Sequence, residues 1–314
     1  MSKKIVIALG GNALQAGSGP ATAEAQLEVV KSTCEYISEI CKEGYEVTLV
    51  HGNGPQVGRI LMASEAAKDV TPAMPFDVCG AMSQGYIGYH LQQSLGHALK
   101  KKGIAMPVVS LVTQVVVDKE DPGFKNPTKP IGMFYSEEEA KQLEAEKGFT
   151  MKEDSGRGYR RVVASPIPKE IVEIDAVKKL IGSSIVITCG GGGVPVVKNA
   201  GGELEGVPAV IDKDFAAELL AEELDVDVFV ILTEVEKVAI NFNKPDQQNL
   251  SKLTYAECEK YISEGQFAPG SMLPKVQAAM KFVKANPNKK AMISSLANGK
   301  DAILGKTGTE IVFE

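Results

Sequence analysis

Hydrophobic residues in this chain form two patterns, short uninterrupted runs and stretches with helical spacing. The first run opens residues 5–14, IVIALGGNAL, where five apolar residues are followed by Gly10, Gly11 and Asn12. Such a run is typical of a strand buried on both faces of a parallel sheet, and the glycines allow the backbone to turn behind it. We expect exposed backbone amides at this turn to form an anion site if other strands end beside it.

A strand–helix–strand unit is predicted next. Residues 22–43 carry apolar residues at steps of three and four, which indicates a helix with one apolar face. Residues 46–50, EVTLV, predict a second strand, which runs into Gly52 and Gly54. The order is that of a βαβ unit, and both of its strands end in glycine.

The glycines after the second strand match a dinucleotide-binding fingerprint only in part. Gly58 falls one position late, and Pro55 stands where a helix would begin. A tight turn with proline in the first helical turn explains this spacing as well, so we do not expect a Rossmann cofactor site. The Gly-Lys-Thr sequence at 305–307 does not complete a P-loop, because Gly299 lies one residue too far upstream.

The middle of the chain changes composition sharply. A helix is predicted at 81–102 and a mostly apolar, β-rich segment at 104–117, whereas residues 118–168 are rich in charge, glycine and proline. We interpret 118–168 as a small inserted lid subdomain over the site. Within it, Ser136 and Glu139 predict a capping box for a short polar helix. Prolines on both sides of Lys129 stiffen the backbone that carries this side chain.

Two features keep more than one interpretation. The cluster of Arg157, Arg160 and Arg161 is most simply a solvated turn, with contact to an anion as the alternative. His51, at the end of the second strand, lies close enough to the predicted anion site for its role to need a test.

The second half of the chain shows the same alternation of helices, apolar strands and glycine-rich turns. The sequence predicts a helix at 169–181, a strand at 184–188, a glycine corner at 190–193 and a loop at 269–275 that leads into another helix; Thr254 and Glu257 predict a second capping box. Strand and helix alternate throughout, which predicts an α/β fold: a three-layer α/β/α sandwich with a mainly parallel central sheet. Strands ending at Gly10, Gly52, Gly190 and Thr233 should meet at one carboxyl edge, where ligands bind in such folds.

Composition narrows the class of partner. A net charge of −6 with no basic run argues against nucleic acid and favours a small molecule. The five cysteines show no C-x-x-C spacing and the three histidines do not cluster with them, so neither a disulfide framework nor a zinc site is indicated. The N-terminal apolar run is too short for a signal peptide or a membrane span, so we expect a cytoplasmic protein with no membrane partner.

Two lysines stand at predicted helix starts. Lys213 lies between Asp212 and Asp214, and Lys275 follows Pro274. A surface salt bridge would explain Lys213, and an aspartate that organises a lysine and a metal beside the glycine edge is the alternative. A cation at a helix start opposes the helix dipole by about 0.3 to 1 kcal/mol unless an anion is also present.

Several long motifs together resemble those of the carbamate kinases within the amino-acid kinase family, along essentially the whole chain. They are GGNA at 10–13, HGNGPQVG at 51–58, NPTKPIG at 126–132, the glycines at 190–193, IDKDFA at 211–216 and PGSMLPK at 269–275. The resemblance implies reversible phosphoryl transfer between ATP and carbamate, giving ADP and carbamoyl phosphate. It also implies Mg²⁺ carried by the nucleotide, no protein metal ligands, a homodimer and a place in arginine breakdown that yields ATP.

The resemblance also implies roles for particular residues. Lys129, Lys213 and Lys275 would bind the phosphates and the transferring group, and Asp214 would orient the lysines. The acceptor and the moving phosphoryl group would be held by Gly10, Gly11, Asn12, Gly52, Asn53 and Gly54. The nucleotide would be held by Gly191, Thr233, Glu234, Val235, Phe242, Pro269 and Met272. Residues 1–314 would form a single domain of this family, with an acceptor-binding part at roughly 1–210 and a nucleotide-binding part at 211–314.

Two other functions stay open at this point. Another amino-acid kinase would need a pocket for a larger acceptor, such as acetylglutamate or a nucleoside monophosphate, and the NPTKPIG segment favours the carbamate type. A non-catalytic nucleotide or metabolite sensor of the same fold would not need the four charged residues Lys129, Lys213, Asp214 and Lys275, all of which are present.

Overall fold

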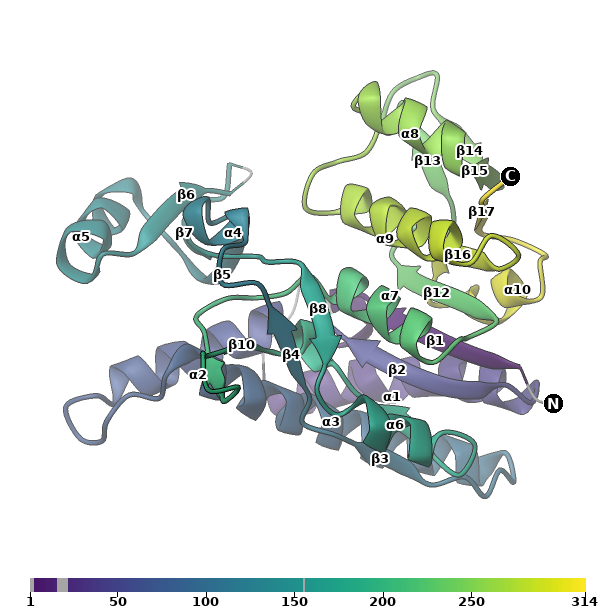
Figure 1. Ribbon diagram of the computed structural model, residues 1–314, viewed down its shortest axis with the longest axis horizontal. Coiled ribbons are helices and arrows are strands. Elements are labelled where there is room, and N and C mark those ends of the chain that lie inside the picture. Colours follow the sequence, from purple (N-terminus) through teal and green to yellow (C-terminus); the bar gives the residue numbers. More distant parts are fainter. Residues whose placement is uncertain (1–2, 16–21, 155) are drawn as a thin grey trace.

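The centre of the molecule is a twisted, mainly parallel sheet (Figure 1). In the computed structural model, which describes residues 3–15, 22–154 and 156–314, this sheet has eight strands in the order β15-β17-β16-β12-β1-β2-β9-β3. Neighbouring strands are parallel except β16 and β17. The strands are β1 (Lys4–Leu9), β2 (Glu46–His51), β3 (Val108–Ser110), β9 (Ile185–Ile187), β12 (Val228–Thr233), β15 (Lys252–Thr254), β16 (Lys290–Ser295) and β17 (Thr309–Val312).

Helices cover both faces of this sheet. Successive side chains of β1 point to opposite faces of the sheet. Ile5, Ile7 and Leu9 belong to one buried core, and Val6 and Ala8 belong to the other. The first core includes side chains from α1 (Ala23–Lys42), α3 (Phe76–Lys101) and α10 (Gly299–Ile303). The second includes side chains from α6 (Ile174–Leu180), α7 (Lys213–Glu223), α8 (Tyr255–Ser263) and α9 (Met272–Ala285). The predicted three-layer α/β/α sandwich is confirmed.

The glycine-ended strands are direct neighbours. β12, β1, β2 and β9 are consecutive and parallel, so Thr233, Gly10, Gly52 and Gly190 lie along one edge, as predicted. Backbone hydrogen bonds continue past the strand ends: Gly10 N donates to Leu232 O at 3.0 Å, and Gly52 N donates to Leu9 O at 3.3 Å. This edge is therefore a fixed platform of backbone groups.

Smaller sheets surround the central one. One has the order β11 (Leu204–Gly206), β10 (Val194–Lys198), β4 (Gln114–Val117) and β8 (Pro168–Ile171), and β13 (Val238–Ile240) pairs with β14 (Gln248–Leu250). The lid sheet has the order β5 (Lys129–Tyr135), β7 (Tyr159–Val163), β6 (Thr150–Glu153); with α4 (Pro122–Lys125) and α5 (Glu137–Lys147) it projects from the body at the left of Figure 1. These elements fall within 118–168, of which Ser155 is outside the described residues. The lid role of the segment stays a prediction.

Three sequence-based boundaries are wrong. A strand, β8, occupies the start of the helix predicted at 169–181, because Ile171 is buried and pairs with Val115 of β4. Helix α3 begins at Phe76 rather than at residue 81, since Pro75 supplies an extended N-cap and Phe76 packs into a buried cluster. Helix α9 begins at Met272, so the second half of the predicted loop 269–275 is its first turn. Both predicted capping boxes are confirmed.

Candidate active site

A cavity of about 200 Å³ lies at the carboxyl edge of the central sheet. We call it the acceptor cavity, after the role that was predicted for several of its lining residues. Its lining brings together nine of the predicted site residues, namely Gly11, Gly52, Asn53, Gly54, Lys129, Gly191, Lys213, Asp214 and Lys275. Gly10 and Asn12 adjoin Gly11 in the chain, and neither belongs to the described lining. Residues scattered over most of the sequence therefore meet in one place.

Helix N-termini converge on this cavity. Helix α2 (Gly54–Ala66) and helix α7 begin at Gly54 and Lys213, which line the cavity, and helix α9 begins directly after Ser271, another lining residue. The first backbone amides of a helix have no partner within the helix, and the dipole places partial positive charge there. Three such ends around one small space make it suited to an anion such as a phosphoryl group.

One buried carboxylate joins two lysines in this cavity. Lys213 Nζ donates to Asp214 Oδ1 at 2.6 Å, and Lys275 Nζ donates to Asp214 Oδ2 at 2.9 Å. The Asp214 side chain is only 2 % exposed. A single carboxylate therefore fixes both ammonium groups and offsets one of their two charges, which leaves the pair with a surplus positive charge.

The same burial and pairing shift the pKa values of the cluster. Burial would raise the pKa of the Asp214 carboxyl, but the adjacent Lys213 and Lys275 outweigh it and hold this pKa far below its usual range. Burial lowers the pKa of the Lys213 ammonium. Burial also opposes the charge on Lys275, but its contact with Asp214 raises the net pKa. The carboxylate is thus ionised at neutral pH and holds Lys275 protonated.

The side chain of the first lysine lies over Gly52. A Cβ atom built on Gly52 would lie 3.4 Å from Cδ and 3.7 Å from Cε of Lys213, so the lysine chain runs directly over this residue. Lys129 approaches from the lid sheet, and its Nζ donates to Asp212 Oδ2 at 2.6 Å. Asp212 also caps α7, because its Oδ1 accepts from the amide of Asp214 at 2.9 Å. Asp212 therefore connects the lid to the buried lysine pair.

Asp212 is a site residue that the predictions omitted from the functional set. An aspartate just before a helical run is a recognised capping signal, and this could have indicated that its carboxylate faces the same space as the helix start. Both oxygens of Asp212 and both of Asp214 accept hydrogen bonds from within the cluster. In the described part of the chain, no three His, Cys, Asp or Glu side chains gather in a way that could hold a metal ion.

His51 is a buried, neutral support for this edge. Its Nδ1 lies 2.9 Å from the carbonyl oxygen of Gly52, to which the Nδ1–H donates, and its ring lies against the backbone of Gly190. The neighbouring Asn53 is also held, because its Nδ2 donates to Ser83 Oγ of α3 at 2.8 Å. Burial lowers the pKa of His51 to about 4. The imidazole is therefore uncharged at neutral pH and adds no positive charge to the cavity.

This burial predicts an acid-sensitive stability. Because the pKa of His51 falls from 6.5 to about 4 on folding, the unfolded chain binds more protons between these values, and stability must drop as pH falls through that window. We expect the free energy of unfolding to lose about 2 to 3 kcal/mol from this residue between pH 6.5 and pH 4. Urea unfolding across this range measures the loss.

A matched pair of variants isolates the histidine. His51→Asn keeps a side-chain donor near Gly52 but cannot titrate, so its stability should depend less on pH in this window. His97→Asn, on the exposed side of α3, should keep the wild-type dependence. Equal pH dependence in His51→Asn and wild type would contradict the assignment.

A second cavity, of about 390 Å³, adjoins the first. We call it the nucleotide cavity, and five predicted nucleotide residues line it: Thr233, Glu234, Val235, Phe242 and Met272. Ser271 lines both cavities, so the two spaces meet at the start of α9. Pro269 is not in the described lining, and Gly191 lies in the acceptor cavity instead. The predictions omitted Ala239 and Phe267, which add apolar surface to this lining.

The arginine cluster is not a solvated turn. Arg160 and Arg161 belong to β7, and their side chains are only 16 % and 20 % exposed. Arg160 pairs with Asp154 and donates to Gly132 O at 3.0 Å, while the Arg161 guanidinium lies 3.7 Å from the ring centre of Phe149. Arg157 alone is exposed. The sequence pattern did not reveal these contacts, because Gly132 and Phe149 are brought to the arginines only by the folding of the lid sheet.

The family of the chain follows from comparison with known proteins. Residues 3–294 match the model of the amino acid kinase family. The chain belongs to this family, and the resemblance seen in the motifs is confirmed.

Relatives that match nearly the whole chain indicate which group within the family it resembles. A carbamate kinase of Clostridium perfringens is 59% identical over 313 residues, which cover 98% of this chain and 99% of that protein. A carbamate kinase-like protein of Escherichia coli is 53% identical over 315 residues, with 99% of both chains covered. The structure of carbamate kinase from Giardia lamblia bound to AMP-PNP is 44% identical, has a TM-score of 0.93 and covers 100% of this chain and 99% of its own.

Proposed function

We propose that this chain catalyses reversible phosphoryl transfer between ATP and carbamate, with ADP and carbamoyl phosphate as the other pair. The observation that carries the proposal is the junction of the two cavities at Ser271. A nucleotide in the larger cavity can extend its phosphates past Ser271 into the smaller one, where the lysines and helix N-termini lie. The relatives described above as carbamate kinases support carbamate as the acceptor.

The cavity volumes favour a small acceptor. The acceptor cavity is about 200 Å³ and must also take the transferring phosphoryl group, which leaves room for a molecule as small as carbamate. A larger acceptor, such as acetylglutamate or a nucleoside monophosphate, would have to displace lining side chains. The non-catalytic sensor is disfavoured, because the four charged residues are present and all take part in ion pairs at this cavity: Lys213 and Lys275 with Asp214, and Lys129 with Asp212.

The chemistry needs charge and position more than proton transfer. A carbamate oxygen attacks the γ-phosphorus, and the bond from that phosphorus to the β–γ bridging oxygen breaks, which leaves ADP. Carbamate is already an anion, so no general base is required. Negative charge on the equatorial oxygens would be met by Lys213, Lys275 and Lys129 and by the amide of Gly11. Asp214 would act by holding two of these lysines in place.

We expect the metal to arrive with the substrate as MgATP. The carboxylates of Asp212 and Asp214 already accept hydrogen bonds from the cluster, and this fits a Mg²⁺ ion bound by phosphate oxygens. Such an ion neutralises charge on the phosphates. The assignment of the nucleotide to Thr233, Glu234, Val235 and Phe242 belongs to this proposal, with the ring of Phe242, 53 % exposed, available to stack on the base.

An acceptor panel tests the proposal. Purified protein with MgATP is expected to form ADP when bicarbonate and ammonia supply carbamate, and to form little with acetate, acetylglutamate or a nucleoside monophosphate. Activity with one of the larger acceptors and none with carbamate would replace this function by that of another family member. Nucleotide binding with no turnover of any acceptor would favour the sensor.

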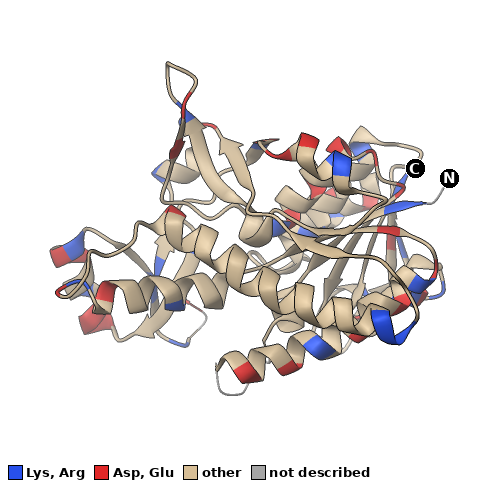
Figure 2. Ribbon diagram, turned by 90° about the horizontal axis from the view of Figure 1, so that it is seen from below, with Lys and Arg blue, Asp and Glu red and all other residues tan. Residues whose placement is uncertain are grey.

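The proposal also includes a homodimer formed through α3. This helix carries no charged residue between Asp77 and Lys100, as its uncharged middle in Figure 2 shows. Val78, Met82 and Tyr89 share one side of it and are 37 %, 49 % and 59 % exposed. An exposed apolar stripe of this kind is typical of an interface. A second copy of the chain is the occupant that we expect.

A charge in the stripe should separate the subunits. Met82→Asp is expected to convert a dimer into a monomer in sedimentation velocity, because a carboxylate would lose its hydration inside an apolar interface. Val70→Asp places the same charge at a site 92 % exposed and outside the stripe, and it should stay dimeric. A wild-type monomer, or a dimer that survives Met82→Asp, would contradict the proposed interface.

The proposal extends to the cellular setting. We expect a cytoplasmic enzyme that produces ATP in arginine breakdown. Among the described residues, no helix combines the length and the apolarity needed to cross a membrane.

A further inference from the structure

The lid sheet is anchored to the body of the molecule at helix α2. Ile131 of β5 and Val163 of β7 are buried in a cluster with Val57 of α2 and Phe76 of α3. At the same place the backbones nearly touch, because a Cβ atom built on Gly58 would lie 2.6 Å from the amide nitrogen of Gly132. The base of the lid is therefore closely packed against α2 at this point.

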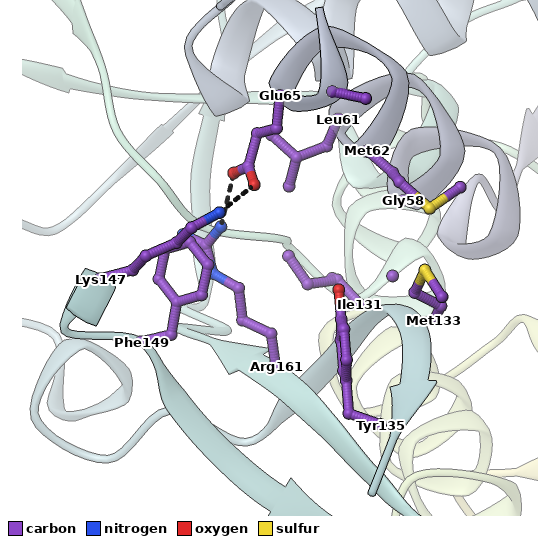
Figure 3. A pocket seen from close by; sticks show the side chains of 12 residues that line it. Gly58, Leu61, Met62, Glu65, Ile131, Met133, Tyr135, Lys147, Phe149 and Arg161 are labelled. Atoms are coloured by element: carbon purple, nitrogen blue, oxygen red, sulfur yellow. Dashed lines mark hydrogen bonds and ion pairs between the residues drawn. The ribbon is translucent and has the colours of Figure 1, made fainter. Parts of the chain in front are cut away.

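Beyond that point the lid and α2 separate around a cavity of about 240 Å³ (Figure 3). We call it the joint cavity. Leu61 and Met62 of α2 line one side, and Met133 and Tyr135 of β5 line the other. Open space of this size means that close packing does not fix the angle between the lid and α2 along this part of the interface.

A cluster of charged side chains bridges the joint cavity at its outer end. Glu65 of α2 contacts two cations of the lid: its Oε2 lies 3.0 Å from Lys147 Nζ, and its Oε1 lies 3.9 Å from Arg161 Nη1. In Figure 3 the Glu65 side chain points from the helix toward both. Lys147 ends α5 and Arg161 lies in β7, so one carboxylate of the body holds two separate elements of the lid.

The strand pairing connects this cluster to the acceptor cavity. In the β5–β7 ladder, Arg161 lies opposite Ile131, and Val163 lies opposite Lys129. Ile131 lines both the joint cavity and the acceptor cavity. Lys129 then reaches Asp212 from the same strand. A tilt of β7 relative to α2 would therefore move β5 and withdraw the Lys129 ammonium.

We propose that Glu65 is a positioning residue, which through Lys147 and Arg161 holds the lid at the angle at which Lys129 reaches the acceptor cavity. The effect of Glu65 on the reaction rate rests on the proposed function, whereas its effect on the position of the lid does not. The three side chains keep 20 % to 35 % of their surface exposed, and ion pairs that water still reaches add little to global stability. The effect of Glu65 is therefore expected on the lid and on Lys129 rather than on the unfolding free energy.

A double-mutant cycle tests whether Glu65 acts through Lys129. Glu65→Gln is expected to lower kcat/KM for carbamoyl phosphate about 10-fold when Lys129 is present and less than about 2-fold in a Lys129→Ala background. Glu65→Asp, which keeps the charge, should recover part of the loss. Glu137→Gln breaks an exposed ion pair with Lys141 on α5 and should leave kcat/KM unchanged in both backgrounds. Equal losses from Glu65→Gln in both backgrounds would overturn the proposal.

Hydrogen exchange provides a readout that needs no catalysis. Backbone amides of β5 and β7 are expected to exchange faster in Glu65→Gln than in wild type or in Glu137→Gln, because opening of the lid exposes them. Lys147→Gln, which breaks the shorter contact from the lid side, should produce a smaller change in the same direction. Unchanged exchange in Glu65→Gln would overturn the proposal even if wild type were active. If the wild-type protein had no kinase activity but the variants still differed from it in exchange as described, the proposed function would be rejected. The role of Glu65 in holding the lid would stand.

Discussion

Replacing Lys213 by alanine is expected to lower kcat by at least about 10²-fold, the scale seen when a preorganised charge stabiliser is removed. The lysine is 12 % exposed, runs over Gly52 and is held by Asp214, so its ammonium group is fixed at the cavity before substrate binds. Lys275→Ala should cause a loss of the same order, because it shares the carboxylate. Initial rates of ATP formation from ADP and carbamoyl phosphate measure both.

Two further variants separate charge from position. Lys213→Arg keeps the charge, but its planar group does not fit the contact with Gly52 and Asp214, so we expect most of the loss to remain. Lys260→Ala removes a lysine that is 65 % exposed on α8 and should leave kcat unchanged. Full activity of Lys213→Ala would show that the role assigned to this lysine is wrong, while the fold would stand.

The Asp214→Asn substitution should damage both stability and activity. It leaves Lys213 and Lys275 buried without a compensating charge, and breaking a buried pair in this way costs about 3 to 5 kcal/mol. Because the amide has one acceptor oxygen in place of two, it can hold only one of the two ammonium groups, and kcat is also expected to fall by about 10² or more. Urea unfolding and initial rates provide the two measurements.

A matched aspartate provides the control. Asp225 pairs with Lys289 at the surface and is 84 % exposed, so Asp225→Asn should change the unfolding free energy by less than about 1 kcal/mol. If Asp214→Asn were as stable and as active as this control, the buried carboxylate would have no part in organising the site. A destabilised but fully active Asp214→Asn would limit its role to structure.

The sequence was informative wherever a physical rule links distant segments. Runs of apolar residues, three of them ending in glycine and one at Thr233, predicted that the ends of β1, β2, β9 and β12 share one edge, because the carboxyl ends of parallel strands must do so. The charged site residues were assigned by motif, and the structure brings Lys129, Lys213, Asp214 and Lys275 around one cavity. Their roles in binding and catalysis remain predictions.

The errors arose where distant contacts decide local structure. Residues 168–171 follow no strong strand pattern, and they form β8 because β4 offers an edge more than fifty residues earlier in the chain. Arg161 looked like part of a charged turn, yet Phe149 and the distant Glu65 hold it in β7. Nothing in the sequence around Glu65 distinguishes it from other surface glutamates of an amphipathic helix. The role proposed for Glu65 depends on its contacts with Lys147 and Arg161, which only the folded chain brings together.

The most direct test of the central claim is the formation of ATP by the wild-type protein from ADP and carbamoyl phosphate in the presence of Mg²⁺. We predict rapid ATP formation that depends on all three components, with carbamate as the second product. Acetyl phosphate, which replaces the amino group by a methyl group, should be a poorer donor. No ATP formation from carbamoyl phosphate, with the protein folded and able to bind nucleotide, would contradict the account.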